Sequence, residues 1–290
     1  MSEAPALKGR VAVVTGASRG VGRGVALALG AAGATVYVTG RSQKEGDAPL
    51  PGTVYKTADD VTAAGGRGIA VVCDHADDAQ VRALFDRVRA EQGGRLDLLV
   101  NCAVAIPEGL TDIGPFWDKP LALTELFGVG MRSAYVAAYH AAPLLIAAQG
   151  LLVNISSAGG RCYMHGPAYG GAKAATDKMS FDMAHDFRPH GVAVLSLWPG
   201  LVKTERTLAV CAAEPEKYGN WLEMGETPEF IGHVIAALWA DPRRLERSGQ
   251  VRYVAELALE YGVRDAGGVQ PPSHRQFLGD PPTFSAAVVE

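Results

Sequence analysis

The chain opens with a short apolar run, a glycine-rich turn and an amphipathic helix, in that order. Residues 11–14 contain no polar side chain, which is typical of a parallel strand covered on both faces. Apolar residues then recur at helical spacing over 21–32, and a second apolar run follows at 35–38. This order predicts a unit of two parallel strands joined by a crossover helix.

The same alternation continues along the chain and predicts one large parallel sheet. We expect further strands at 69–73, 96–100, 151–155 and 192–197, with a weaker candidate at 250–255. Helices are expected at 57–64, 81–88, 121–148, 167–185 and 230–240. This pattern favours an α/β fold: a single doubly wound parallel sheet of about seven strands with helices on both faces. Such sheets bind ligands at the carboxyl ends of their strands.

The predicted sheet accounts for residues 1–256, which we interpret as one domain because no repeat or change of composition interrupts them. Residues 257–290 are interpreted as a C-terminal extension, helical at its start and then rich in proline and glycine. At 290 residues, the chain is long enough to bury a sizeable core without metals or disulfides.

Composition and charge argue against several classes of protein. Apolar residues make up 48% and charged residues 20% of the chain, which is a globular rather than a disordered balance. The formal net charge of −4 argues against general nucleic-acid binding. No apolar run reaches the roughly 18 residues of a membrane-spanning helix, and residues 1–10 lack a signal-peptide core. The four cysteines form no CxxC pair and the seven histidines no HExxH motif, so we expect reduced thiols, a cytoplasmic protein and no metal site.

The turn after the first strand carries the glycines that a phosphate-binding loop needs. It reads TGASRGVG over 15–22, with glycines at 16, 20 and 22. Glycine lets the backbone approach a pyrophosphate, and the helix that follows offers free N–H groups and a positive dipole end. The spacing alone is a weak signal, but its place between a strand and a helix predicts a dinucleotide site. The alternative is a purely structural turn.

The end of the second strand indicates which dinucleotide binds. Sites for NAD usually place a carboxylate there, which binds the ribose hydroxyls. Here the sequence is TGRS over 39–42, so no acidic residue at that point repels a 2′-phosphate, and Arg41 can pair with one. Arg19 in the glycine-rich turn is a second candidate cation. We therefore expect NADP(H) to be preferred over NAD(H); the alternative is that both arginines are ordinary solvated residues.

A tyrosine and a lysine four residues apart are candidate catalytic groups. Tyr169 and Lys173 share one face of the helix expected over 167–185. A nearby ammonium favours tyrosinate, which allows the phenol to act as a general acid or base near neutral pH. The fifth predicted strand runs into Ser156 and Ser157, and a hydroxyl there can hydrogen-bond a substrate oxygen beside the phenol.

Together these motifs resemble those of the short-chain dehydrogenase/reductase family. The resemblance covers roughly residues 8–256, and its motifs stand in the family's order, which makes it specific. They are TGASRGVG at 15–22, Cys73-Asp74, Asn101-Cys-Ala, Ser156-Ser157, YGGAK at 169–173 and PGLVKT at 199–204. The resemblance implies a Rossmann-type fold and an oxidoreductase that transfers a hydride between a nicotinamide cofactor and a carbonyl compound or alcohol.

The resemblance also assigns roles to the matching residues. Tyr169 donates the proton to the carbonyl oxygen, Lys173 binds the nicotinamide ribose, and Ser157 orients the substrate. The family's usual serine-to-tyrosine distance selects Ser156, whereas its use of the second serine of a pair selects Ser157, which we choose. The implied cofactor-binding residues are Gly16, Ser18, Arg19, Gly20, Val21, Gly22, Arg41, Asp74, Asn101, Tyr169, Lys173, Pro199, Gly200, Val202 and Thr204.

One position departs from the family's pattern. The family carries a catalytic asparagine in the helix after the fourth strand, where this chain has Gly130. In a helix over 121–148, Gly130 lies on the core-facing side, and a glycine inside a helix costs about 1 kcal/mol relative to alanine. Gly130 either allows close packing against a neighbouring helix or leaves its carbonyl to hold a water that contacts Lys173.

Three functions are open at this point. The first is an NADP(H)-dependent oxidoreductase that interconverts a small carbonyl compound and an alcohol, working as a homodimer or homotetramer. The second is a dinucleotide-binding sensor or scaffold without turnover, which the missing asparagine favours and the intact Ser157, Tyr169 and Lys173 oppose. The third is a lyase or epimerase that returns its cofactor unchanged. We expect the oxidoreductase, with no nucleic-acid or membrane partner.

Overall fold

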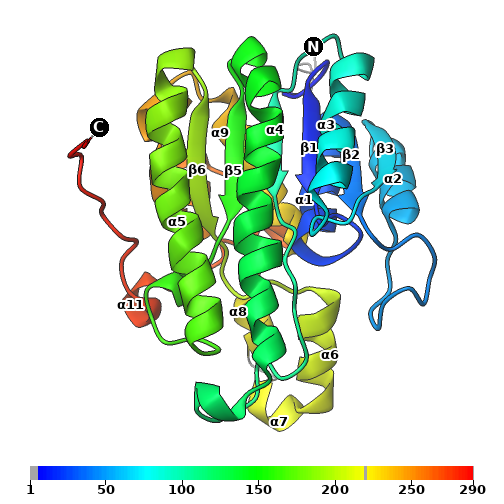
Figure 1. The fold of residues 1–290 in the computed structure, drawn as a ribbon. Coiled ribbons are helices and arrows are strands. Elements are labelled where there is room, and N and C mark those ends of the chain that lie inside the picture. The colour runs from blue at the N-terminus through cyan, green and yellow to red at the C-terminus, as the bar shows by residue number, and fades with distance from the viewer. Residues whose placement is uncertain (1–5, 219–220, 290) are drawn as a thin grey trace.

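Seven parallel strands form one sheet in the computed structural model, which describes residues 6–218 and 221–289 (Figure 1). The strands are β1 (Val11–Thr15), β2 (Thr35–Gly40), β3 (Arg67–Val72), β4 (Leu98–Asn101), β5 (Leu151–Ile155), β6 (Ala193–Trp198) and β7 (Val251–Tyr253). Their order is β3-β2-β1-β4-β5-β6-β7. The chain therefore moves outward in one direction from β1 to β3 and in the other from β4 to β7, and parallel sheets bind ligands where that direction reverses.

Helices cover both faces of the sheet, as the sequence pattern predicts. One layer holds α1 (Gly20–Ala31), α2 (Val54–Ala63), α9 (Pro228–Ala240) and α10 (Val254–Tyr261). The other holds α3 (Asp78–Glu91), α4 (Ser133–Ala148) and α5 (Pro167–Phe187). Three shorter helices, α6 (Glu205–Ala213), α7 (Pro215–Tyr218) and α8 (Trp221–Met224), lie between β6 and α9 in the chain.

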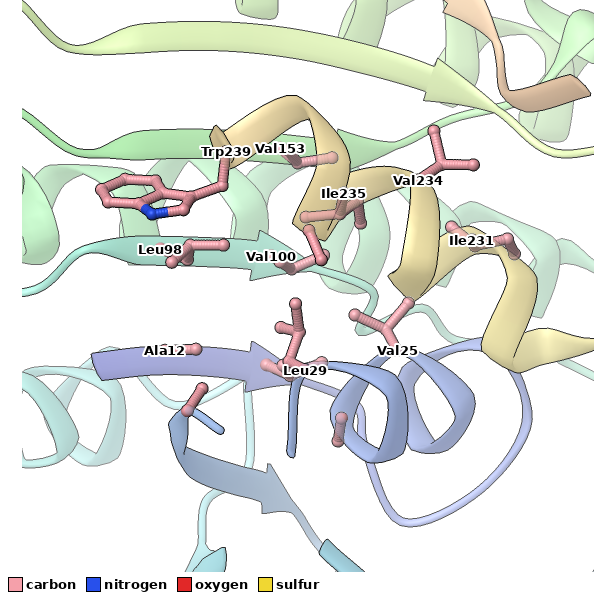
Figure 2. Close-up of a cluster of buried hydrophobic side chains, with 14 of the residues drawn as sticks. Ala12, Val25, Leu29, Leu98, Val100, Val153, Ile231, Val234, Ile235 and Trp239 are labelled. Atoms are coloured by element: carbon pink, nitrogen blue, oxygen red, sulfur yellow. The ribbon is translucent and has the colours of Figure 1, made fainter. Parts of the chain in front are cut away.

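Alternating side chains of the strands divide the core into two halves. Ala12 and Val14 of β1 pack toward α1 and α9, whereas Val11 and Val13 pack toward the other helix layer. Figure 2 shows the first half, where side chains of α1 and α9 meet those of β4. A strand covered on both faces has no polar side, which is why these strands read as continuous apolar runs.

Two helix boundaries differ from the sequence-based expectation. Helix α2 begins at Val54 rather than at residue 57, because the Thr53 hydroxyl accepts a hydrogen bond from the Lys56 N–H at 3.0 Å and caps the helix. The prediction of one helix over 121–148 is wrong: α4 begins only at Ser133. Two short turns precede it, η2 (Leu121–Thr124) and η3 (Phe127–Arg132).

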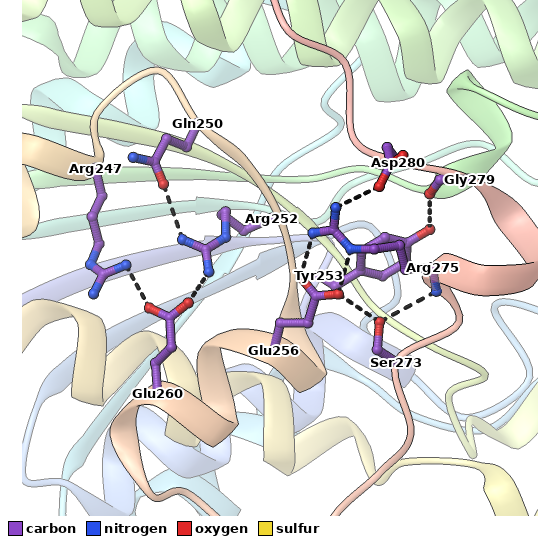
Figure 3. A network of polar contacts seen from close by, with 10 residues as sticks. All are labelled: Arg247, Gln250, Arg252, Tyr253, Glu256, Glu260, Ser273, Arg275, Gly279 and Asp280. Carbon is purple, nitrogen blue, oxygen red and sulfur yellow. Dashed lines mark hydrogen bonds and ion pairs between the residues drawn. The ribbon is translucent and has the colours of Figure 1, made fainter.

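The C-terminal extension is bound to the end of the sheet by a polar network (Figure 3). Arg275, in the short helix α11 (Arg275–Leu278), donates two hydrogen bonds of 2.7 and 2.6 Å to Glu256 of α10. The Tyr253 hydroxyl donates to the Gly279 carbonyl at 2.8 Å. The boundary expected at residue 256 lies inside α10, whose Leu257 is buried in the core. Among the described residues, no helix is both long and apolar enough to span a membrane.

Candidate active site

A cleft of about 920 Å³ lies at the carboxyl ends of the strands. Its walls come from the turn after β1, the ends of β2 to β6, the start of α5 and the start of α6. Helices α6 and α7 project beyond the sheet at this end (Figure 1). All the candidate site residues except Asn101 line the cleft, although they are spread over 189 positions from Gly16 to Thr204, both included.

The glycine-rich turn is held close to the end of β4. Gly16 has φ +64°, and a Cβ built on it would lie 2.6 Å from the Ala103 Cα, so no larger residue fits. The Thr15 hydroxyl accepts hydrogen bonds of 3.0 Å from the N–H groups of Cys102 and Ala103. These hydrogen bonds hold the turn, and with it the start of α1, at the cleft. Free N–H groups at the start of a helix can hold a phosphate. This part of the chain fits the pyrophosphate of a dinucleotide.

Two arginines lie at the other end of this wall: Arg19 in the glycine-rich turn and Arg41 directly after β2. The Arg19 side chain donates to the Ser42 hydroxyl at 2.8 Å and to the Gly52 carbonyl at 2.7 Å, which ties the glycine-rich turn to the loop after β2. Arg41 is 75% exposed, and its guanidinium lies 3.8 Å from the Asp74 carboxylate. Asp47 also lines the cleft here. This end of the cleft therefore carries both signs of charge.

The catalytic candidates meet where β5 and α5 face the cleft. Lys173 donates from Nζ to the Ile155 carbonyl at 3.1 Å, and the same Nζ lies 5.8 Å from the centre of the Tyr169 ring. The buried Ser156 hydroxyl donates to the Lys173 carbonyl at 3.2 Å. Ser157 is half-buried, and its hydroxyl accepts from the Gly159 N–H at 3.1 Å. The structure thus brings a phenol, an ammonium and a hydroxyl to one wall of the cleft.

Known proteins are similar to this chain in sequence and in fold. The short chain dehydrogenase family matches residues 10–214. Dehydrogenase/reductase SDR family member 1 of Mus musculus is 42% identical over 273 residues, which cover 90% of this chain and 85% of the mouse protein. The chain belongs to the short-chain dehydrogenase/reductase family. The Homo sapiens protein of the same name is 41% identical over the same coverage. A solved short-chain dehydrogenase/reductase mutant of Serratia marcescens superposes with a TM-score of 0.71 at 28% identity, covering 85% of this chain and 96% of that one.

Membership of the short-chain dehydrogenase/reductase family makes the protein an enzyme and an oxidoreductase that uses a nicotinamide dinucleotide. In this family the glycine-rich turn holds the dinucleotide, and the turn geometry described above fits that group.

Burial raises the pKa of the Cys102 thiol to about 12, which keeps this cleft residue in its unreactive protonated form.

Asn101 is the one candidate that the structure does not bring to the cleft. It is 6% exposed, and its amide donates to the Asn154 side chain at 2.9 Å and to the Ala134 carbonyl at 3.4 Å. Asn154 in turn donates to the Ser180 hydroxyl at 2.9 Å. Asn101 therefore belongs to a buried polar chain that joins β4 and β5 to the helices over them.

Gly130 lies in a sharp turn and not inside a helix, which corrects the sequence-based placement. Its φ is +140° and its ψ −58°, and the preceding Val129 is also non-helical. The Gly130 N–H donates to the Ser133 hydroxyl at 3.0 Å, and the Val129 carbonyl accepts from the Ala105 N–H at 2.8 Å. Since Gly130 and Val129 line the cleft, this turn shapes its wall with backbone rather than with the family's asparagine.

Replacing Gly130 with asparagine should lower the free energy of unfolding by about 1–3 kcal/mol, because a side chain at φ +140° is strained. Urea denaturation measures the change. Gly128→Ala is the matched control, since a Cβ at Gly128 meets nothing within 4 Å and its φ is not positive. An asparagine variant as stable as the wild type would contradict the strained geometry.

Asp177 of α5 is a buried acidic residue that the sequence analysis does not single out. It is 1% exposed, and it accepts hydrogen bonds from the Ser196 hydroxyl at 2.6 Å and from the Trp198 indole at 3.1 Å. Burial raises the pKa of its carboxyl group, and these hydrogen bonds partly oppose that effect. The sequence does indicate that Asp177 lies on the same face of α5 as Lys173, because it follows Lys173 by four residues.

Apart from the carboxylate of Glu125, the side chains from residues 103–130 that line the cleft are apolar. They include Val104, Ile106, Pro107 and Val129. The sequence reading did not single out these residues, because nothing in their local pattern separates them from an ordinary loop. Such a wall suits an uncharged organic substrate.

The loop before Tyr169 packs against its ring. The rings of His165 and Tyr169 meet edge to face at 5.1 Å, and Lys119 donates to the His165 carbonyl at 3.2 Å. Burial and the nearby Lys119 ammonium lower the pKa of His165, so its ring is neutral at pH 7. Neutral His165 therefore supports the Tyr169 ring without adding charge beside it.

Proposed function

We propose that this enzyme is an NADP(H)-dependent reductase of apolar ketones or aldehydes, with Tyr169 as its general acid and base. The observation that carries the proposal is the convergence of Ser157, Tyr169 and Lys173 on one wall of the cleft that also contains the glycine-rich turn. A protein that binds a dinucleotide without turnover does not need Ser157, Tyr169 and Lys173 together beside its cofactor.

Ser157, Tyr169 and Lys173 each have a separate role in the proposed reaction. The bound nicotinamide supplies or accepts the hydride. Ser157 donates a hydrogen bond to the substrate oxygen and fixes its position. Tyr169 donates its phenolic proton to the same oxygen as the alcohol forms, and takes it back in the reverse direction. Lys173, fixed by the Ile155 carbonyl, places an ammonium next to the phenol and favours its ionised form during the transfer.

A cofactor-oxidation assay tests the proposal. Purified enzyme is incubated with NADPH or NADH and a panel of ketones, aldehydes and quinones, and the loss of absorbance of the reduced nicotinamide is followed. We expect loss of NADPH with apolar carbonyls. Tight dinucleotide binding without turnover across the panel would favour the sensor function instead, and conversion of a substrate without net cofactor loss would favour a lyase or epimerase.

The preference for NADP(H) rests on Arg41 and Arg19 at the end of the cleft after β2. Arg41 is exposed and separated from Asp74 by 3.8 Å, so its guanidinium can turn to a 2′-phosphate. Arg19 is already held beside the Ser42 hydroxyl, which can donate to the same phosphate. The carboxylates of Asp47 and Asp74 oppose this preference, so the affinity for the two dinucleotides has to be measured separately.

Arg41→Ala should weaken NADPH binding about tenfold and leave NADH binding within about twofold, because only NADPH carries the phosphate that pairs with Arg41. Titration calorimetry with each dinucleotide measures both dissociation constants. Lys44→Ala removes a neighbouring exposed cation and controls for general loss of positive charge. Equal weakening for the two dinucleotides, or tighter binding of NADH by the wild type, would contradict the assignment.

A further inference from the structure

Glu205 connects two walls of the cleft that lie far apart in the sequence. It is the first residue of α6, and the preceding Thr204 caps that helix by accepting from the Thr207 N–H at 3.3 Å. The Glu205 carboxylate accepts a hydrogen bond of 2.9 Å from the N–H of Gly20. Gly20 is the first residue of α1 and the second glycine of the glycine-rich turn. The carboxylate of one wall is therefore bound to the phosphate-binding segment of the other.

The first turn of α1 favours an anion, and Glu205 supplies one. Residues 20–22 of this turn are Gly-Val-Gly, so α1 brings no acidic side chain of its own. The free N–H groups and the dipole of α1 both favour negative charge at this point. Arg19 adds a positive charge that interacts with the Glu205 carboxylate. The carboxylate thus uses the same N–H group and the same field that a pyrophosphate would use.

We infer that Glu205 is an affinity-determining residue that competes with the cofactor's pyrophosphate for the first turn of α1. This inference rests on the proposed dinucleotide function of the cleft. The Gly20 N–H that Glu205 occupies belongs to the proposed pyrophosphate site, and two anions at one site repel each other. Glu205 must therefore leave Gly20 when the dinucleotide binds, which weakens the apparent affinity and releases the start of α6.

The surrounding contacts define which part of the chain can move. Lys203 donates from its backbone N–H to the Glu226 carbonyl at 2.9 Å, and Val202 forms a parallel bridge with Glu226. These contacts bind the backbone of residues 202 and 203 to that of Glu226. Glu205 lies just after this anchored point, so its release requires only a rotation of its side chain or a shift of the start of α6.

Two variants of Glu205 test the competition. We expect Glu205→Ala to bind NADPH about tenfold more tightly than the wild type, measured by quenching of intrinsic fluorescence. The dissociation constant of Glu205→Gln for NADPH should lie between those of Glu205→Ala and the wild type. Its neutral amide can still accept a hydrogen bond from the Gly20 N–H but no longer repels phosphate. Glu216→Gln removes an equal charge from an exposed site on α7 and should leave the dissociation constant unchanged. Unchanged or weaker binding by Glu205→Ala would overturn the inference.

A second measurement separates this inference from the proposed function. Amide hydrogen exchange of Gly20, followed by NMR without cofactor, should be faster in Glu205→Ala than in the wild type, because the acceptor is gone. Equal exchange rates would show that the contact does not persist in solution and would overturn the inference. If the wild type binds neither NADPH nor NADH at millimolar concentration, the proposed function fails, whatever the exchange rates are.

Discussion

Replacing Tyr169 with phenylalanine should lower kcat by a factor of about 10³ and leave dinucleotide binding within about twofold. The change removes one oxygen atom, the proton donor to the substrate, and loss of a general acid typically costs 10²–10⁴ in rate. The ring itself remains, with its edge-to-face contact to His165 at 5.1 Å, so the fold is kept. Steady-state turnover of NADPH with an apolar carbonyl measures kcat.

Tyr163→Phe is the matched control for this prediction. Tyr163 lies in the loop before α5 and is 78% exposed, so removal of its hydroxyl should leave kcat unchanged. Equal melting temperatures of the two variants would exclude a folding defect. If Tyr169→Phe kept more than a tenth of the wild-type kcat, the proton would have to come from another group, and the proposed role of Tyr169 would be abandoned.

The sheet and most of its helices were predictable because their pattern is local. A parallel strand buried on both faces is apolar throughout, and a helix packed on one side repeats every 3.6 residues. Ala12 and Leu29 have their places in the core for these reasons. The order of the motifs then identified the family, and with it the cleft, because the carboxyl ends of parallel strands meet at one edge of the sheet.

Contacts between distant segments could not be predicted in this way. Gly130 was placed in a helix because its apolar neighbours have helical spacing, but the loop after β4 binds the Val129 carbonyl and turns the backbone there. The bond from Gly20 to Glu205 spans 185 positions, and neither residue carries a local sign of the other. Asn101 was assigned to the cleft by family analogy, whereas the direction of its side chain depends on Asn154 of the next strand.

The surroundings of Glu226 likewise could not be predicted from the local sequence, and they affect the free energy of unfolding of the protein. Its side chain is 1% exposed, and among the described residues neither of its carboxylate oxygens has a hydrogen-bond partner. The backbone N–H of Gly200 and the carboxylate of Asp265 face it, and His274 of the C-terminal extension lies near the same Gly200. Burial raises the pKa of Glu226 to about 8; the Gly200 N–H opposes this effect and the Asp265 carboxylate reinforces it.

The stability of Glu226→Gln relative to the wild type should therefore increase as the pH rises from 5 to 8. Between the ordinary glutamate pKa of 4.5 and about 8, the folded state keeps a proton that the unfolded state has lost. The free energy of unfolding of the wild type consequently falls as the pH rises through this window, and the whole penalty is present above pH 8. Glutamine has no proton to lose, so at pH 7 the variant avoids a penalty on the order of 3 kcal/mol. Melting curves at pH 5, 7 and 8 measure the difference.

The dependence on pH, rather than the stability at one pH, decides this prediction. Glutamine also buries a polar group without a partner, which shifts the stability of the variant by an amount that does not depend on pH. The melting-temperature difference between variant and wild type should therefore grow from pH 5 to pH 8, by several degrees in a protein of this size. Glu223→Gln, an exposed site three residues earlier, should show no such growth. A difference that stays constant with pH would mean that Glu226 is ionised in the folded protein, with a partner such as His274 stabilising its charge.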